Sequence, residues 1–232
     1  MREEEIKNLN IMAKATNYNR WIFNKIKPYL GERILEVGCG IGNITELLLE
    51  NRNTKLVVGI DSSPECLDII NHKLNGYKKF ESFSCDVSSK EVLSLKKYNF
   101  DTIVCINVLE HIKNDLVMLE NIVQFNCTLI LLVPALQSLY GTIDEVDGHF
   151  RRYEKKTLEE KLAQSGWKIH KSFYLNLLGI PIWFLHGKIL KKSVHPSRQV
   201  SLLDKFLFLE VLLEKIVNLP VGLSLLYICK NE

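Results

Sequence analysis

The chain has 232 residues, of which 47% are hydrophobic and 25% charged, a composition typical of a globular protein with one sizeable core. The net charge of +3 and the lack of a basic stripe with interleaved aromatic residues argue against nucleic acid as a partner. The first ten residues lack the apolar core of a signal peptide, and no apolar stretch reaches the ~18 residues of a membrane span, so we expect a cytoplasmic protein.

The first segment, residues 3–30, is expected to be helical. Ile6, Leu9 and Met12 give it a partial apolar face, and the helical pattern continues to Pro28. Trp21 is interpreted as a side chain that packs this segment against the rest of the protein.

A tight run of glycines, Glu36-Val-Gly38-Cys-Gly40-Ile-Gly42, separates a short apolar strand from a helix. Because glycine has no Cβ, the turn can adopt positive φ and a ligand can lie against bare backbone. Asp61 ends the next apolar strand, where an acidic side chain can accept hydrogen bonds from both hydroxyls of a ribose.

Short runs rich in valine and isoleucine alternate with helical segments along the first half of the chain. We expect strands at 33–38, 55–60, 79–84, 101–106 and 127–134, and helices at 42–51, 64–74, 88–95 and 112–123. This alternation predicts βαβ units and a parallel sheet with helices on both faces. Ligands of such sheets bind outside the carboxyl ends of the strands, where the motif residues fall.

The segment after the fifth strand is expected to be a loop with many polar side chains, the kind of segment where binding and catalysis concentrate. It contains Tyr140, Asp144, Glu145, Asp147, His149, Arg151, Arg152 and Tyr153. The two arginines either pair with the acidic residues of this loop, or one of them clamps an acceptor carboxylate or phosphate. Thr157 is expected to cap the next helix, with Glu160 completing a capping box.

An insertion at about 176–220 precedes the last strand, LSLLYICK. Its apolar residues have helical spacing on more than one face, so it must be buried or meet an apolar partner. The first interpretation is burial against the sheet or against a second subunit in a homodimer. The second is an apolar acceptor channel or a peripheral membrane contact, helped by Lys188, Lys191 and Lys192.

Four stretches together carry a family resemblance: E-x-G-x-G-x-G at 36–42, Asp61 at a strand end, CDV at 85–87 and FDTIVCINVLEHI at 100–112. Over about residues 18–135 the chain resembles the class I S-adenosylmethionine-dependent methyltransferases. The NAD(P)-binding pattern G-x-G-x-x-G fits less well, because Asn43 stands where its last glycine is required.

The resemblance implies an α/β fold, with a doubly wound, mostly parallel seven-stranded sheet and a helical insertion before the last strand. It implies one methyltransferase domain over residues 1–232. Residues 1–30 would form a helical lid, 31–135 the half that binds the cofactor, and 136–232 the half that binds the acceptor.

The resemblance also assigns the residues expected to bind S-adenosylmethionine. Tyr18 would face the sulfonium, where an aromatic ring gains cation–π attraction. Asp86 would bind the adenine, although it can instead cap the following helix, and Ser62 would join Asp61 at the ribose or serve a helix start. The full expected set is Tyr18, Glu36, Gly38, Cys39, Gly40, Asp61, Ser62, Asp86, Val87, Asn107 and Val108.

An oxygen acceptor must lose a proton, and His111, His149 and Tyr140 are the candidate bases. For His111 a structural interpretation stays open, in which a histidine at a helix start bonds to local backbone. The sequence has no H-x-x-H pair, cysteine cluster or close acidic set, so no metal site is expected.

The expected function is transfer of a methyl group from S-adenosylmethionine to an oxygen or nitrogen of a small-molecule, saccharide or lipid-linked acceptor, with S-adenosylhomocysteine as product. Two alternatives stay open at this point. One is an NAD(P)-dependent oxidoreductase on a similar scaffold, and the other is a non-catalytic partner protein that kept the scaffold.

Overall fold

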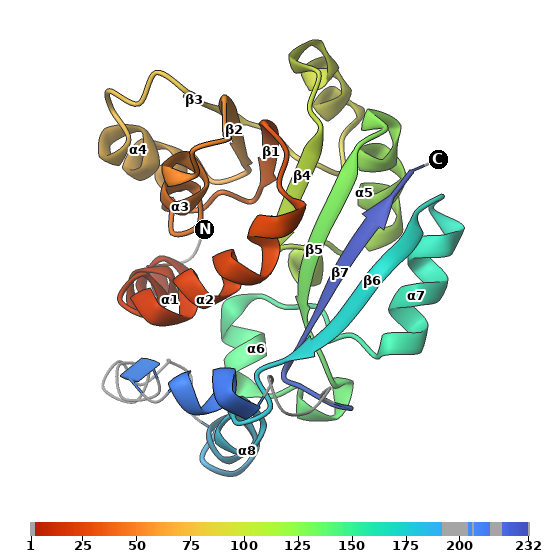
Figure 1. The fold of residues 1–232 in the computed structure, drawn as a ribbon. Helices are drawn as coiled ribbons and strands as arrows, with labels where there is room; N and C mark the ends of the chain where they lie inside the picture. Colours follow the sequence, from red (N-terminus) through yellow and green to blue (C-terminus); the bar gives the residue numbers. More distant parts are fainter. Residues whose placement is uncertain (1–2, 192–203, 206, 214–219, 232) are drawn as a thin grey trace.

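The computed structural model describes residues 3–191, 204–205, 207–213 and 220–231 (Figure 1). Within them, one sheet has the strand order β3-β2-β1-β4-β5-β7-β6, with β7 antiparallel to both of its neighbours. The strands are β1 (Arg33–Val37), β2 (Leu56–Asp61), β3 (Phe80–Ser84), β4 (Thr102–Ile106), β5 (Thr128–Pro134), β6 (Lys168–Leu175) and β7 (Ser224–Lys230). The predicted doubly wound α/β fold is confirmed.

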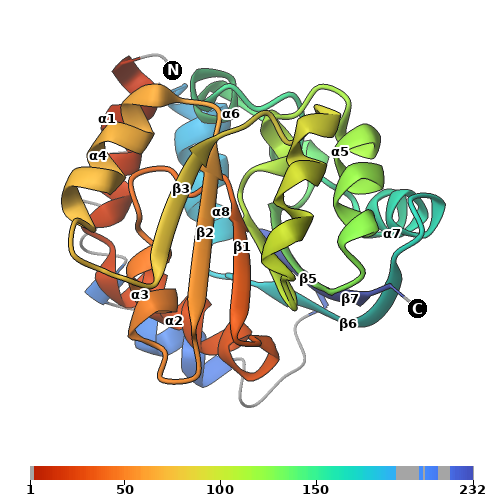
Figure 2. The same cartoon turned by 90° about the horizontal axis from the view of Figure 1, so that it is seen from above.

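Helices cover both faces of the sheet because alternate residues of each buried strand point to opposite sides. Ile34 belongs to one apolar core and its neighbour Leu35 to the other. The helices α2 (Thr16–Ile26), α3 (Thr45–Glu50) and α4 (Pro64–Lys73) cover the first face, and η2 (Lys90–Tyr98), α5 (Asp115–Ile122) and α7 (Lys155–Gln164) cover the second (Figure 2).

The N-terminal segment forms two helices rather than one. Helix α1 (Glu3–Ala13) ends before Ala15, and α2 then leads into the short helix η1 (Lys27–Tyr29), which contains Pro28. Trp21 is 6% exposed and lies in the core with α3 and α4, as its packing interpretation predicted. Helix α1 instead lies beside α6 (Thr142–Asp147), where the side-chain amide of Asn8 donates to Asp147.

The segment between β5 and α7 differs from the expected loop. It contains the short helix η5 (Gln137–Leu139) and the helix α6, whose third residue, Asp144, accepts a hydrogen bond from the backbone of Gly141 at 3.0 Å. A side chain that reaches back in this way satisfies a free N–H group at a helix start. The prediction that Thr157 caps this helix is wrong, because α7 begins at Lys155 and Thr157 lies inside its first turn.

The described part of the insertion is helical and only partly buried. It includes α8 (Gly179–Trp183), its π-helical continuation η6 (Phe184–Ile189), and helical residues at 204–205 and 207–213; Lys192 lies outside the described residues. Asp204 accepts hydrogen bonds from the backbone N–H groups of Asn17 and Tyr18, so this segment docks on the start of α2. In the described parts of the chain, no helix has both the length and the apolar character to cross a membrane.

Candidate active site

A cavity of about 720 Å³ opens at the carboxyl ends of β1, β2, β4 and β5. Its wall also includes residues of α1, α2, α6 and α8, so the N-terminal helices, the sheet and the insertion all contribute. The order of the sheet reverses between β1 and β4, and open α/β sheets bind ligands at this switch point. The volume lies within the range of small-molecule sites, ~300–1,000 Å³.

The glycine turn after β1 brings bare backbone to the cavity wall. Gly38 and Gly40 have φ of +70° and +51°, values that residues other than glycine rarely adopt. A Cβ on Gly38 would lie 2.3 Å from a methyl group of Val108, so glycine is required there for space as well as for conformation.

Asp61 holds the glycine turn and faces the cavity. Its Oδ2 accepts from the backbone of Gly40 at 2.9 Å, and its Oδ1 accepts from the backbone of Ser63 at 2.9 Å. Each carboxylate oxygen can accept a further hydrogen bond, so the side chain can still take ribose hydroxyls. The hydroxyl of Ser63 accepts from the backbone of Cys66 and caps α4. Its neighbour Ser62 lies at the cavity wall.

Asp86 and Val87 line the cavity after β3. The Oδ1 atom of Asp86 accepts from the backbone of Ser88 at 2.8 Å, a local turn, whereas η2 is capped by the side chain of Ser89. One oxygen of Asp86 therefore serves the turn, and the other remains for a ligand amino group.

Glu36 is a buried acid at the cavity wall. It is 4% exposed, and its Oε2 has no hydrogen-bond partner in the described part of the chain. Burial raises the pKa of Glu36 to about 8, and the nearby charge of Asp61 adds to the effect. Because an unpaired buried carboxyl is costly, a ligand with an amino group would supply the missing donor.

Tyr18 lines the cavity from α2. Its ring lies 5.5 Å from that of Trp21, and its hydroxyl is near Ser224, which begins β7, and Asn176, which follows β6. Burial raises the pKa of this hydroxyl. The other predicted cofactor residues, Cys39, Asn107 and Val108, also line the cavity.

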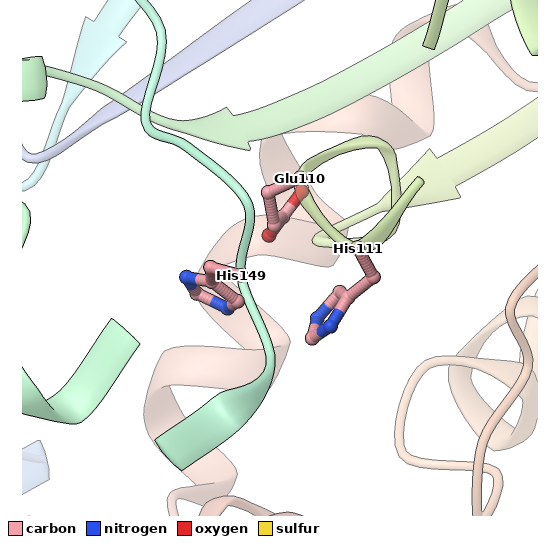
Figure 3. A group of neighbouring side chains, drawn as sticks. All are labelled: Glu110, His111 and His149. Carbon is pink, nitrogen blue, oxygen red and sulfur yellow. The ribbon is translucent and has the colours of Figure 1, made fainter. Parts of the chain in front are cut away.

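Three side chains meet in the cavity wall beyond the glycine turn (Figure 3). Glu110 and His111 lie on the short helix η3 (Leu109–His111), and His149 follows α6. The two imidazole rings are 4.6 Å apart and edge-to-face, and one ligand-type atom from each of the three residues lies within 4.8 Å of the others. We call Glu110, His111 and His149 the Glu110 cluster.

His149 is oriented by Asp144. Its Nδ1 is 2.9 Å from Oδ1 of Asp144, and the same oxygen accepts from Nε of Arg152 at 2.8 Å. Arg152 in turn lies 4.4 Å above the ring of Trp183. Burial alone would lower the pKa of His149, but the hydrogen bond to Asp144 and the charge of Glu110 raise it.

Glu110 has no exposed surface, and neither of its oxygens has a hydrogen-bond partner among the residues that the structure describes. Burial raises the pKa of Glu110 to about 7. Burial also lowers the pKa of His111 to about 4, with a smaller contribution from His149. Glu110 was not among the predicted site residues; the available signal was an acidic residue inside the apolar run INVLEHI.

Tyr140 and the two arginines stabilise the segment that carries His149. Tyr140 does not belong to the cavity wall among the described residues, and its hydroxyl donates to the carbonyl of His149 at 2.7 Å. Arg152 pairs with Asp144, as the pairing interpretation predicted, whereas Arg151 pairs at 2.8 Å with Asp115 of α5 rather than with an acid of its own segment.

Comparisons with known proteins agree on the class. A family model described as a methyltransferase domain matches residues 35–125. A ubiquinone biosynthesis O-methyltransferase of Coxiella burnetii is 27% identical over 123 residues, 53% of this chain and 47% of that protein. The tRNA N(3)-cytidine methyltransferase METTL6 of Rattus norvegicus is 24% identical over 196 residues, 82% of this chain and 62% of that one.

Among solved structures, a SAM-dependent methyltransferase from Archaeoglobus fulgidus has a TM-score of 0.60 at 18% identity, covering 92% of this chain and 94% of that one. This similarity concerns the fold. The chain spans about half the length of the first curated relatives that it matches.

The strand order, the glycine turn and the acid that ends β2 define a nucleotide-cofactor site of the methyltransferase type. The chain has the fold of the class I S-adenosylmethionine-dependent methyltransferases, and a methyltransferase-domain family matches its residues 35–125. Its residues fit the cofactor of this class, because the unpaired Oε2 of Glu36 and the bare backbone at Gly38 both lie at the cavity wall.

Proposed function

We propose that this protein transfers a methyl group from S-adenosylmethionine to a hydroxyl oxygen of an apolar small molecule or lipid-linked acceptor. The observation that carries the proposal is the Glu110 cluster, which lies in the same cavity as the glycine turn. A neutral amine needs no prior loss of a proton, whereas a hydroxyl does, and the cluster offers groups that can take one.

The cofactor half positions the donor. Gly38 and Gly40 give close backbone approach, Asp61 accepts from the ribose, Asp86 accepts from the adenine and Glu36 accepts from the amino group of the methionine part. When bound, S-adenosylmethionine supplies a methyl group already activated by a positive sulfur. The protein then has to align the acceptor and exclude water, and such alignment is worth on the order of 7–11 kcal/mol of barrier.

The acceptor half supports an apolar substrate. The cavity wall on this side includes Ile143, Leu178, Ile182, Trp183, Leu207 and Leu223. Apolar side chains continue onto the surface of the insertion, where Phe184, Ile189 and Phe208 are 46%, 59% and 60% exposed. This surface suits a lipid-linked acceptor presented at a membrane, or a second subunit, and we infer the first because it continues the apolar cavity wall.

The similarity to ubiquinone biosynthesis O-methyltransferases supports an oxygen acceptor with an apolar body. The similarity to a tRNA methyltransferase raises a different acceptor, RNA. The net charge of +3 supports the former, since RNA binding depends on many neutralised phosphates.

The test has two stages. Calorimetry with S-adenosylhomocysteine first measures binding to the wild-type protein, and stoichiometric binding is expected. Labelled S-adenosylmethionine then reports transfer to three acceptor groups: apolar phenols and alcohols with and without a lipid tail, amines, and tRNA. Label in the apolar hydroxyl compounds supports the proposal. Label only in amines or tRNA contradicts the acceptor, and no binding of S-adenosylhomocysteine contradicts the activity.

A further inference from the structure

We propose that Glu110, His111 and His149 bind a divalent transition-metal ion, and that this ion binds the hydroxyl oxygen that receives the methyl group. The proposal rests on the proposed function for its second half. The metal site itself follows from the geometry of the cluster and was not expected from the sequence.

The cluster offers a ligand set that first-row divalent ions accept. Two imidazoles and one carboxylate suit Zn²⁺, Mn²⁺ and Fe²⁺ better than they suit Ca²⁺. The three ligand-type atoms lie within 4.8 Å of one another. Metal bonds of ~2.0–2.2 Å place the ligands of a filled site roughly 3–4 Å apart, so small side-chain rotations close the site.

Glu110 supplies an independent observation that points to a cation. Its carboxylate has no exposed surface, lines the cavity and has no hydrogen-bond partner among the described residues. Arg152, which also lines the cavity, donates to Asp144 and to the carbonyl of Ala135 instead. Because a buried carboxylate without a donor is costly, a bound cation explains why the side chain is kept there.

His149 has the surroundings of a metal ligand. Its Nδ1 is hydrogen-bonded to Asp144, which sets the tautomer in which Nε2 carries a lone pair. Asp144 is itself held by Arg152, by the backbone of Gly141 and by the indole N–H of Trp183. Histidine ligands of metals commonly bond through the other nitrogen to a fixed carboxylate, which orients the ring and raises its basicity.

Three protein ligands leave coordination positions open for a substrate oxygen. An ion in this position lowers the pKa of the bound hydroxyl, whose proton passes to solvent. The oxygen then shares its electron pair with the methyl carbon, and the carbon–sulfur pair returns to sulfur as a neutral thioether. The charges balance, no electron is transferred, and the metal keeps its oxidation state.

The experiment measures metal binding directly, apart from catalysis. Protein dialysed against chelator is titrated with Mn²⁺, followed by electron paramagnetic resonance, and in parallel by calorimetry with Zn²⁺ and Mg²⁺. One ion per chain is expected, and pulsed spectra of the Mn²⁺ form should show coupling to imidazole nitrogen. Glu110→Gln and His149→Ala should each weaken binding by about tenfold or more. Glu120→Gln, an exposed acid of α5, is the matched control and should bind like the wild type.

Binding of S-adenosylhomocysteine and cooperative unfolding show that each variant is folded. Absence of one-to-one binding, lack of imidazole coupling, or equal affinity in Glu110→Gln and the wild type would overturn the metal site. Full methyl transfer by metal-free protein would overturn the role of the metal ion in catalysis. The Glu110 cluster would then act as a direct base, and the proposed function would stand. If the wild-type protein does not bind S-adenosylhomocysteine, the proposed function is contradicted, whereas the metal site is not.

Discussion

The carboxylate of Asp144 lies 2.9 Å from Nδ1 of His149, and this contact joins α6 to the cavity wall. Although burial alone would raise the pKa of Asp144, its hydrogen bond with His149 and the charge of Arg152 hold the pKa below its ordinary value. Asp144 also accepts from the backbone of Gly141 and the indole of Trp183. One fully buried carboxylate thus connects a helix start, the insertion and the candidate catalytic histidine.

Asp144→Asn should lower the free energy of unfolding by about 3–5 kcal/mol, because Arg152 would stay buried without its countercharge. Denaturant unfolding at neutral pH measures the change. Glu145→Gln, on the exposed side of the same helix, is the control and should change stability by less than about 0.5 kcal/mol. Equal stability of the two variants would mean that the buried pair does not hold this segment.

Asp61→Ala should weaken binding of S-adenosylhomocysteine by about 1–3 kcal/mol, since the ribose loses its acceptor and Gly40 loses the partner that holds the turn. Calorimetry gives the affinity. Asp68→Ala removes an exposed acid from the neighbouring helix α4 and should leave affinity unchanged. An unchanged affinity in Asp61→Ala would contradict the ribose assignment.

Gly38→Ala should both destabilise the protein and weaken cofactor binding. Its positive φ alone costs about 1–2 kcal/mol, and the new Cβ would lie 2.3 Å from Val108, so the turn must shift. Gly76→Ala separates the two effects, because Gly76 also has positive φ, +105°, but nothing lies within 4 Å of its added Cβ. We expect Gly76→Ala to lose stability alone and to bind S-adenosylhomocysteine normally, as read by thermal shift and calorimetry.

The stability of the cofactor-free protein should fall as pH rises from about 5 to 8, in part through Glu36. The ordinary pKa of its carboxyl is 4.5 and the folded-state pKa is about 8, so over this window the unfolded chain has lost the proton that the folded chain keeps. The contribution is up to about 1.4 kcal/mol per pH unit and disappears below pH ~4.5, where both states are protonated.

Glu36→Gln is neutral at every pH and should reduce this slope in denaturant unfolding. Glu32→Gln, at the surface before β1, should retain the slope of the wild type. The burial argument for Glu36 fails if both variants and the wild type show the same pH dependence.

Tyr140→Phe tests whether this hydroxyl takes the acceptor's proton. Because it donates to the carbonyl of His149 and lies outside the cavity wall, its loss should cost about 0.5–1.5 kcal/mol of stability and less than tenfold in turnover. His149→Ala should cost far more turnover, since the imidazole itself faces the cavity. A larger loss in Tyr140→Phe than in His149→Ala would restore Tyr140 as the base.

The cofactor half could be predicted because its signals are local. The motif residues lie at or near the carboxyl ends of strands, as Asp61 ends β2 and Asp86 comes two residues after β3, and a parallel sheet brings these ends to one edge. The division into lid, cofactor half and acceptor half stays a prediction. The contacts of the segments after β5 were harder to predict because the partners are far apart in sequence: Asp204 holds the start of α2, and Arg151 pairs with Asp115 of α5.

The sequence by itself determined the sheet, the glycine turn and the acidic residues around it, because strand periodicity and the freedom of glycine act over a few neighbouring residues. Only the tertiary structure brought His149 to Glu110 and His111 and turned Tyr140 away from the cavity. Those placements depend on how α6 packs between α1 and the insertion, and packing between distant segments leaves no fixed spacing in the chain.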